Sequence, residues 1–325
     1  RQMCIRDSPG TSQMPQEIGA VASRDVNPTM EKDNAESYDR DPMFEVDVNN
    51  LESQMPAIID ELLTGRGAVM IREAFDNDQV AEARRLIMEY SSEADRETHF
   101  HGGHKDQIHL QRRVWNLLDK GEIFEAMVQH PVVAAIASAF LGNQFILGSI
   151  AANRILPGGP GQEPHIDYPY WDMYDREGFP THINSSYPLN LQATIPVDPF
   201  TAESGASAFL PGSQGTLGYP EVEDRERFFE ECSRMVAEPG DCVLFNGMVW
   251  HCAMPNTTES DRSAILIEYL AKFVAPIEDQ KGGVRQEVID RGTPLLHQLV
   301  GLDYPYPKLF DEAPPEVVIG RDLQE

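Results

Sequence analysis

Cysteine, basic side chains and long apolar runs are all scarce in this 325-residue chain. The four cysteines, Cys4, Cys232, Cys242 and Cys252, have neither paired CxxC spacing nor the density of a disulfide scaffold, which predicts reduced thiols. No run of about eighteen apolar residues occurs, and the N-terminus lacks a charged segment followed by an apolar one. We therefore expect neither membrane insertion nor secretion, and a cytoplasmic protein is the default.

Acidic side chains outnumber basic ones by 53 to 26, which gives a net charge of -27. Such a charge repels phosphate backbones and anionic membranes, so we expect neither nucleic acid nor membrane as a partner. The acidity itself is typical of a highly soluble protein and says little about chemistry. A small-molecule substrate is the partner we expect.

The chain divides into three segments that differ in amino-acid composition. Residues 1–40 are polar and aperiodic, which predicts a disordered leader, part of which we expect to be non-native. Residues 41–275 are expected to form a single domain, because 41% hydrophobic residues provide ample core. Residues 276–325 are rich in proline and charge, which predicts an irregular extension serving as a cover or an oligomer contact. We expect a monomer or homodimer.

Hydrophobic periodicity predicts helices first and strands later. The helices are expected at 51–63, at 76–94 with a capping box of Asp76 and Gln79, and at 121–129 and 131–141, with a strand at 68–71. Short segments rich in Ile, Val, Leu and Phe follow between turn-forming clusters, which favours an antiparallel barrel or sandwich with flanking helices. These strands are expected at 144–156, 187–198, 206–210, 241–246, 248–253 and 263–273.

One short motif places two metal-ligating side chains together. His165 and Asp167 are two residues apart, so on a strand both side chains point to one face. Two histidines and one carboxylate on one side of iron(II) leave room for a bidentate cosubstrate and dioxygen. A His-x-Asp pair is weak by itself, because nine histidines make one chance occurrence unsurprising.

A second histidine and an arginine follow in a region dense in turn formers. A strand, a bend at Gly247 and a second strand are predicted to end on His251, and Arg262 begins the next strand. A hairpin here would place Arg262 beside His251. A guanidinium in a partly dry barrel suits the distal carboxylate of an oxo-diacid whose other end chelates the metal.

The order of these motifs resembles the phytanoyl-CoA dioxygenase family of iron(II)- and 2-oxoglutarate-dependent oxygenases, over about residues 50 to 273. The residues that carry it are His165-Ile-Asp167, a Gly-x-x-x-x-x-Pro-Gly-Ser segment ending at Ser213, Gly240-Asp241, His251-x-x-x-Pro-Asn256, and Arg262 eleven positions after that histidine. The resemblance implies a mainly β fold with flanking helices, built on a double-stranded β-helix, also called a jelly-roll or cupin-like barrel.

The resemblance also implies the chemistry. Iron(II) would be held by His165, Asp167 and His251, Arg262 would bind 2-oxoglutarate as cosubstrate, and O2 would be the oxidant. The expected reaction is hydroxylation of a small organic molecule with release of succinate and CO2. Asn153 and Thr194 look like the family's polar pocket positions. The chain departs from the family at Cys252-Ala253, where Gly-Ser is common, and at Gln214, where His is common.

Other candidate site residues have an equally simple structural explanation. Tyr168, Tyr170 and Trp171, with Tyr174, either wall a substrate pocket or pack beneath a loop. The cluster of His99, His101, His104 and His109 lies among glycines and charges that favour a loop without fixed metal geometry. Cys252 neighbours a predicted ligand, yet as the adjacent strand residue it should face the opposite side and pack in the core.

Two other functions compete with the oxygenase. A non-redox, cupin-like protein could use zinc or manganese, since nitrogen and oxygen ligands do not choose the metal by themselves. Arg262 argues against this reading, because a non-redox site has no evident need for a diacid anchor. A catalytically silent barrel kept for interaction is disfavoured by the intact three-ligand set.

Overall fold

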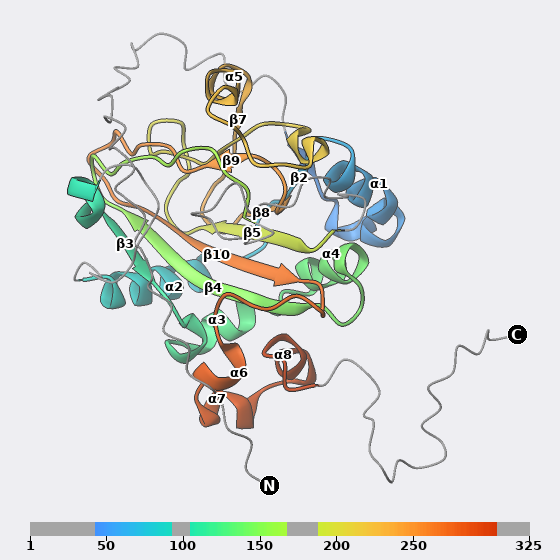
Figure 1. Cartoon of the computed structure of the whole chain (residues 1–325). Coiled ribbons are helices and arrows are strands. Elements are labelled where there is room, and N and C mark those ends of the chain that lie inside the picture. Colours follow the sequence, from blue (N-terminus) through green and yellow to red (C-terminus); the bar gives the residue numbers. More distant parts are fainter. Residues whose placement is uncertain (1–42, 93–104, 168–187, 304–325) are drawn as a thin grey trace, which may run out of the picture. The chain divides into compact units, whose positions relative to one another are not determined.

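The structure is a computed structural model, and it describes residues 43–92, 105–167 and 188–303. Within these ranges the strands form two sheets (Figure 1). The larger has the order β1-β2-β8-β5-β10-β4-β3, and the smaller has the order β7-β6-β9. The strands are β1 (Phe44–Glu45), β2 (Ala68–Ile71), β3 (Gln111–Val114), β4 (Ile146–Ile155), β5 (Asn190–Pro196), β6 (Ala208–Phe209), β7 (Ser233–Arg234), β8 (Cys242–Asn246), β9 (His251–Cys252) and β10 (Arg262–Leu270).

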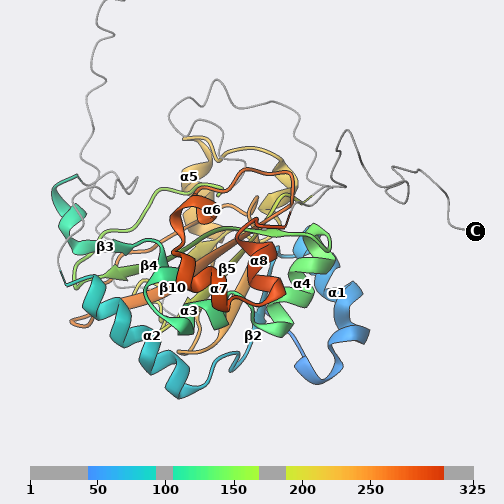
Figure 2. The ribbon, with the colours of Figure 1, turned by 90° about the horizontal axis from the view of Figure 1, so that it is seen from below.

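Helices cover one face of the larger sheet. Figure 2, seen from below, shows α2, α3, α7 and α8 lying across that face. The α-helices of the described residues are α1 (Leu51–Leu63), α2 (Asn77–Tyr90), α3 (Glu122–Met127), α4 (Pro131–Leu141), α5 (Asp224–Glu231), α6 (Gln280–Gly283), α7 (Gln286–Arg291) and α8 (Pro294–Leu299). The pairings in the larger sheet are antiparallel except for β1 with β2.

Alternation along the central strands separates a packed core from a polar interior. On β10, Ile265, Ile267 and Tyr269 belong to the main core cluster, which also contains helical residues such as Leu62 and Ile87. Because successive strand residues point to opposite faces, the alternate residues of β10 face the other way, into the space between the two sheets. Arg262, the first residue of the strand, is one of these alternate residues and is buried there.

The predicted helices and the first strand are confirmed. Asp76 caps α2 by accepting from the Gln79 backbone N–H at 2.9 Å, and the Gln79 side chain accepts from the Asp76 N–H at 3.0 Å. This reciprocal pair satisfies two N–H groups that have no partner inside the helix. It fixes where α2 starts, after strand β2 and its short turn.

Two local expectations are wrong. Residues 276–325 were expected to be irregular, but the described part contains α6, α7 and α8, and Leu296 and Leu299 are buried in the main core. The predicted hairpin joining His251 to Arg262 does not exist, because β9 pairs with β6 whereas β10 pairs with β4 and β5. His251 also begins its strand and does not end it.

Candidate metal centre

The structure brings His165, Asp167 and His251 together between the two sheets. One potential ligand atom from each lies within 4.8 Å of the others. Asp167 Oδ2 lies 3.3 Å from His251 Nε2, and its Oδ1 lies 3.7 Å from His165 Nε2. A carboxylate and two imidazole nitrogens converging on one point could hold a single divalent metal ion.

Backbone hydrogen bonds fix this arrangement. His165 and His251 exchange two N–H to C=O bonds of 3.0 Å across an isolated bridge, so the two rings arise from adjacent antiparallel segments. The Asp167 N–H donates to the Gly247 carbonyl at 3.0 Å, which anchors the third member to the turn after β8. The site thus bridges two segments that are far apart in the chain.

Each imidazole is oriented by a carbonyl two residues earlier. His165 Nδ1 lies 2.8 Å from the Glu163 carbonyl oxygen, and His251 Nδ1 lies 2.9 Å from the Val249 carbonyl oxygen. A carbonyl only accepts, so Nδ1 carries the proton of the neutral ring and Nε2 presents its lone pair. Metal-binding histidines are typically held by such a bond from the other ring nitrogen.

The Asp167 carboxyl and the His251 imidazole shift each other's pKa. Burial alone would raise the pKa of the Asp167 carboxyl, but His251, His165 and the Arg113 guanidinium lower it below its ordinary value. Burial alone would lower the pKa of His251, but the Asp167 carboxylate raises it. Without metal, the site therefore favours Asp167 as the anionic carboxylate and His251 as the protonated ring. A metal cation can replace the proton on that ring.

Arg262 is a buried cation at the other side of the same cavity. Its side chain donates to the Ser204 carbonyl at 3.3 Å and to the Met254 carbonyl at 3.5 Å, and its guanidinium carbon lies 4.9 Å from the centre of the Phe200 ring. No Asp or Glu forms an ion pair with it in the described ranges. Burial, with repulsion from Arg234, lowers the pKa of Arg262 to about 10 although Asp198 opposes the shift.

A cavity of about 90 Å³ connects Arg262 with the three potential ligands. Asn153 and Thr194, the two pocket positions expected from the sequence, line it from β4 and β5. The Asn153 Oδ1 atom is buried and accepts no hydrogen bond from any described residue. A buried, unsatisfied acceptor beside a cation without an acidic partner indicates a polar ligand.

Sequence reasoning missed several residues of this cavity, among them Arg113 on β3, Gln162 before the His-x-Asp segment, and Ser207 beside β6. The Gln162 side chain accepts from the Ala253 N–H at 3.1 Å, and the Arg113 guanidinium lies 4.6 Å from the centre of the Trp115 ring. For Arg113 the sequence contained one weak indication of a role, because two adjacent arginines, Arg112 and Arg113, interrupt a segment of otherwise ordinary composition. Nothing local identified β3 as a strand of the larger sheet.

Several candidates are not placed at the site. Tyr168, Tyr170, Trp171 and Tyr174 lie outside the described residues, as do His99, His101 and His104. His109 is exposed within a short 3-10 helix.

Cys252, one residue from His251, faces the other way, as expected, and belongs to a separate buried cluster with Trp250 and Phe228. Burial raises the pKa of its thiol, so it stays protonated and has the character of a core residue.

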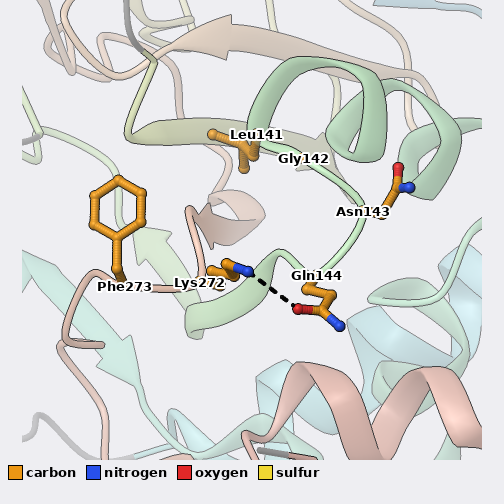
Figure 3. A pocket seen from close by; sticks show the side chains of 6 residues that line it. All are labelled: Leu141, Gly142, Asn143, Gln144, Lys272 and Phe273. Atoms are coloured by element: carbon orange, nitrogen blue, oxygen red, sulfur yellow. Dashed lines mark hydrogen bonds between the residues drawn. The ribbon is translucent and has the colours of Figure 1, made fainter. Parts of the chain in front are cut away.

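Figure 3 shows a second hollow. It is lined by Leu141, Gly142, Asn143, Gln144, Lys272 and Phe273, and the Lys272 ammonium donates to the Gln144 Oε1 atom at 3.3 Å. This hollow is remote from the metal set. Leu270, the last residue of β10, precedes the lining residue Lys272 by two positions and is eight residues along the strand from Arg262, or roughly 26 Å at the usual strand rise. It contains no candidate metal ligand, so we assign no chemistry to it.

The geometry is that of a jelly-roll protein in which a candidate set of metal ligands and a buried arginine line one cavity. The profile of the family Phytanoyl-CoA dioxygenase (PhyH) matches residues 64–264, and the chain belongs to this family. The resemblance predicted from the motifs is therefore confirmed, and the non-redox alternative is not favoured. Among the described residues, no helix has the length and apolar character needed to span a membrane.

Similar curated proteins are fungal dioxygenases. Dioxygenase af480 of Aspergillus fumigatus is 25% identical over 199 residues, which is 59% of this chain and 59% of that protein. Multifunctional dioxygenase ausE of Penicillium brasilianum is 29% identical over 167 residues, 49% of this chain and 53% of that protein. The chain thus spans between half and two thirds of the length of these relatives.

Similar solved structures confirm the fold class. The non-heme alpha-ketoglutarate-dependent epimerase SnoN from nogalamycin biosynthesis matches with a TM-score of 0.51 and 19% identity, over 70% of this chain and 85% of that chain. The carbocyclase SnoK from the same biosynthesis matches with a TM-score of 0.50 and 19% identity, over 67% and 83%. SnoN has been solved in complex with Fe3+, alpha-ketoglutarate and nogalamycin RO.

Proposed function

We propose that this protein is an iron(II)- and 2-oxoglutarate-dependent dioxygenase that hydroxylates a small organic molecule. The observation that carries the proposal is Arg262: a buried guanidinium, 3% exposed and without an acidic partner among the described residues, shares a cavity with a three-ligand metal set. A site that held only a metal ion would gain nothing from that cation. A dianionic cosubstrate gives both features a role.

His165, Asp167 and His251 would hold the iron. Their two Nε2 atoms and one carboxylate match the facial set of two histidines and a carboxylate that binds iron(II) in oxygenases. When bound, iron with 2-oxoglutarate and O2 supplies the oxidation of a C–H bond, coupled to conversion of the cosubstrate to succinate and CO2. The carbonyls of Glu163 and Val249 keep the rings in the tautomer that leaves Nε2 available.

The cosubstrate would lie between this set and Arg262. The Arg262 fork suits a bidentate contact with the distal carboxylate, and Phe200 shields it from water. Arg113 contributes to lowering the pKa of Asp167, so its charge acts at the metal end, where it would balance the other carboxylate. Asn153 and Thr194 would complete the polar lining.

The class of product rests on the relatives. The similar curated proteins are named dioxygenases, which supports oxygenation, whereas an epimerase and a carbocyclase share the fold, so the fold does not choose the outcome. The substrate would be a small molecule, and Tyr168, Tyr170 and Trp171 stay predictions for its pocket. Cytoplasmic location and a monomeric or homodimeric state also stay predictions.

Anaerobic reconstitution tests the proposal. Apoprotein is loaded with iron(II), 2-oxoglutarate is added, and the visible spectrum is recorded for a metal-to-ligand charge-transfer band, with zinc-loaded protein as the control. We expect a band with iron and none with zinc, and no band in Asp167→Ala. Stoichiometric iron without any band on adding 2-oxoglutarate would contradict the proposal and return the protein to the non-redox class.

A further inference from the structure

A row of four residues crosses the larger sheet next to the metal set. Gln192 on β5 pairs with Phe245 on β8 on one side and with Glu268 on β10 on the other. Glu268 in turn pairs with Ser149 on β4. The centre of the Phe245 ring lies 4.9 Å from that of the His251 ring, so the row begins at a potential metal ligand. Because neighbouring strands are about 4.8 Å apart, Glu268 is roughly 10 Å across the sheet from Phe245.

The side chains of this row face the space between the two sheets. The residues on either side of Glu268, Ile267 and Tyr269, belong to the main core cluster on the opposite face. Alternation therefore gives Glu268 the same face as Arg262, six residues earlier on β10. The other members of the row line the cavity of the metal set: Phe245, Gln192 and Ser149. Strand β10 thus carries a cation at the start of this face and a carboxyl group near its end.

The carboxyl group of Glu268 occupies space that two glycines leave open. The residue is 1% exposed, and the Asn190 amide donates to its Oε1 atom. A Cβ atom at Gly148 would overlap the Glu268 carboxyl group. A Cβ atom at Gly247 would overlap the Asn190 amide. Larger residues at these two positions would displace the pair, so the surrounding backbone is built to accommodate it.

Backbone hydrogen bonds connect this pair to the metal set. The Asp167 N–H donates to the Gly247 carbonyl at 3.0 Å, and the Gly247 N–H donates to the Asn190 carbonyl at 3.2 Å. Asp167 therefore lies beside the start of β5, where Asn190 is. Arg262 is six residues from Glu268 along β10, or roughly 20 Å at the usual strand rise. The cosubstrate would lie between the metal set and Arg262, which leaves the Glu268 side of the metal set for the substrate.

We propose that Glu268 binds a protonated amino group of the substrate and so selects small organic amines; this deepens the proposed function and rests on it. A carboxylate has about four acceptor positions, of which the Asn190 amide uses one. Burying a carboxylate is costly, and an ammonium group of the ligand offsets that cost. Iron(II) with Asp167 and the 2-oxoglutarate dianion carries one net negative charge that Arg113 offsets, so the loaded centre itself does not repel an ammonium group.

Ligand-observed NMR on the zinc-loaded protein with 2-oxoglutarate measures binding without turnover. The probes have similar shapes and three different charges: benzylamine, which is protonated at neutral pH, benzyl alcohol and benzoate. The wild type is expected to bind benzylamine at least tenfold more tightly than benzyl alcohol, and benzoate most weakly. In Glu268→Gln, which keeps an acceptor for the Asn190 amide but removes the charge, benzylamine and benzyl alcohol should bind with similar affinity.

Three further variants sharpen the test. Glu268→Gln combined with Gln192→Glu moves the carboxylate to the facing position on β5, which lines the same cavity, and the preference for benzylamine should return. Gln192→Glu alone adds a second carboxylate and should increase the preference, which tests the site even where Glu268→Gln does not fold. Glu125→Gln is the matched control, since Glu125 is also a buried glutamate but pairs with Arg291 and does not line the cavity. Its preference should equal that of the wild type.

The outcomes separate this inference from the proposed function. A wild-type protein that binds benzylamine no better than benzyl alcohol, or binds none of the three probes, overturns the assignment of Glu268. A preference that survives in Glu268→Gln also overturns it, because another group then attracts the cation. A preference that is lost in Glu268→Gln supports the amine site. If that same wild type gives no charge-transfer band with iron(II) and 2-oxoglutarate, only the proposed function is contradicted.

Discussion

Replacing Arg262 by methionine should make the metal-free protein more stable and abolish its response to 2-oxoglutarate. Burial lowers the pKa of Arg262 from its ordinary value to about 10, so the folded chain holds the cation less favourably than the unfolded chain does. At about 1.4 kcal/mol per pKa unit, this corresponds to a cost of roughly 3 kcal/mol. Because the folded-state pKa is the lower one, the full cost is present at every pH below about 10.

Methionine removes this cost but also some favourable contacts. Two long hydrogen bonds, to the carbonyls of Ser204 and Met254, and the contact with Phe200 are lost. Each of these contributes about 1 kcal/mol or less. A methionine side chain of similar length fills much of the space, so the net gain in the free energy of unfolding should be about 1 kcal/mol.

Binding of iron(II) and 2-oxoglutarate should make the wild type more stable than Arg262→Met, the reverse of the order expected without ligand. With iron(II) and 2-oxoglutarate at about 100 times its dissociation constant, the wild type gains about 2.7 kcal/mol and the variant gains little. Urea unfolding under anaerobic conditions measures all four free energies. Arg227→Met is the matched control, since this exposed arginine pairs with Glu231 on the helix surface and with no other acidic side chain in the described ranges, and the change should alter stability by less than about 1 kcal/mol.

Two results would contradict this expectation for Arg262. A metal-free Arg262→Met protein destabilised by several kcal/mol would mean that the guanidinium has a structural partner. Equal stabilisation of variant and wild type by 2-oxoglutarate would mean that the cosubstrate does not reach Arg262.

Three further variants test the site and the scaffold. His165→Ala should lose iron on anaerobic reconstitution and desalting, and stoichiometric iron by elemental analysis would remove His165 from the ligand set. Asp76→Ala should lower the free energy of unfolding by about 1 kcal/mol in urea, since it deletes the cap of α2; no change would mean that this cap is dispensable. Tyr269→Phe should cost about 1 to 2 kcal/mol in the same assay, because the Tyr269 hydroxyl donates to the Val128 carbonyl at 2.9 Å in a fully buried position; an unchanged midpoint would show that this bond adds nothing.

Local signals in the sequence predicted the scaffold well. The Asp76 and Gln79 pair placed the start of α2, and Pro131 and Gly142 bounded α4, because caps and breakers act within a few residues. The motif His165-x-Asp167 also brings its two side chains together through local geometry. Elements that depend on nearby residues could therefore be read without the structure.

Long-range pairing could not be predicted in the same way. The polar strand β3 carries Arg113 into the cavity, but its four residues show no alternating pattern. The expected hairpin failed because the turn after Cys252 crosses from the smaller sheet to the larger one. Cross-sheet contacts set these positions, and sequence spacing contains no record of them.

Gln214 illustrates a residue whose role changes with context. The sequence comparison placed it where the family commonly has a histidine, which suggested a difference at the site. The structure has Gln214 outside the cavity lining, with its amide donating to the Gly65 carbonyl at 3.0 Å. It thus connects the segment after β6 to the turn between α1 and β2, a contact that no local pattern announces.

A crystal structure of the protein with iron(II) and 2-oxoglutarate, grown without oxygen, would show both the metal ligands and the position of the cosubstrate. We expect metal density bound by the Nε2 atoms of His165 and His251 and by a carboxylate oxygen of Asp167. We also expect one 2-oxoglutarate molecule that chelates this metal and directs its distal carboxylate to Arg262. A metal bound elsewhere, or a distal carboxylate turned away from Arg262, would contradict the proposed function of this site.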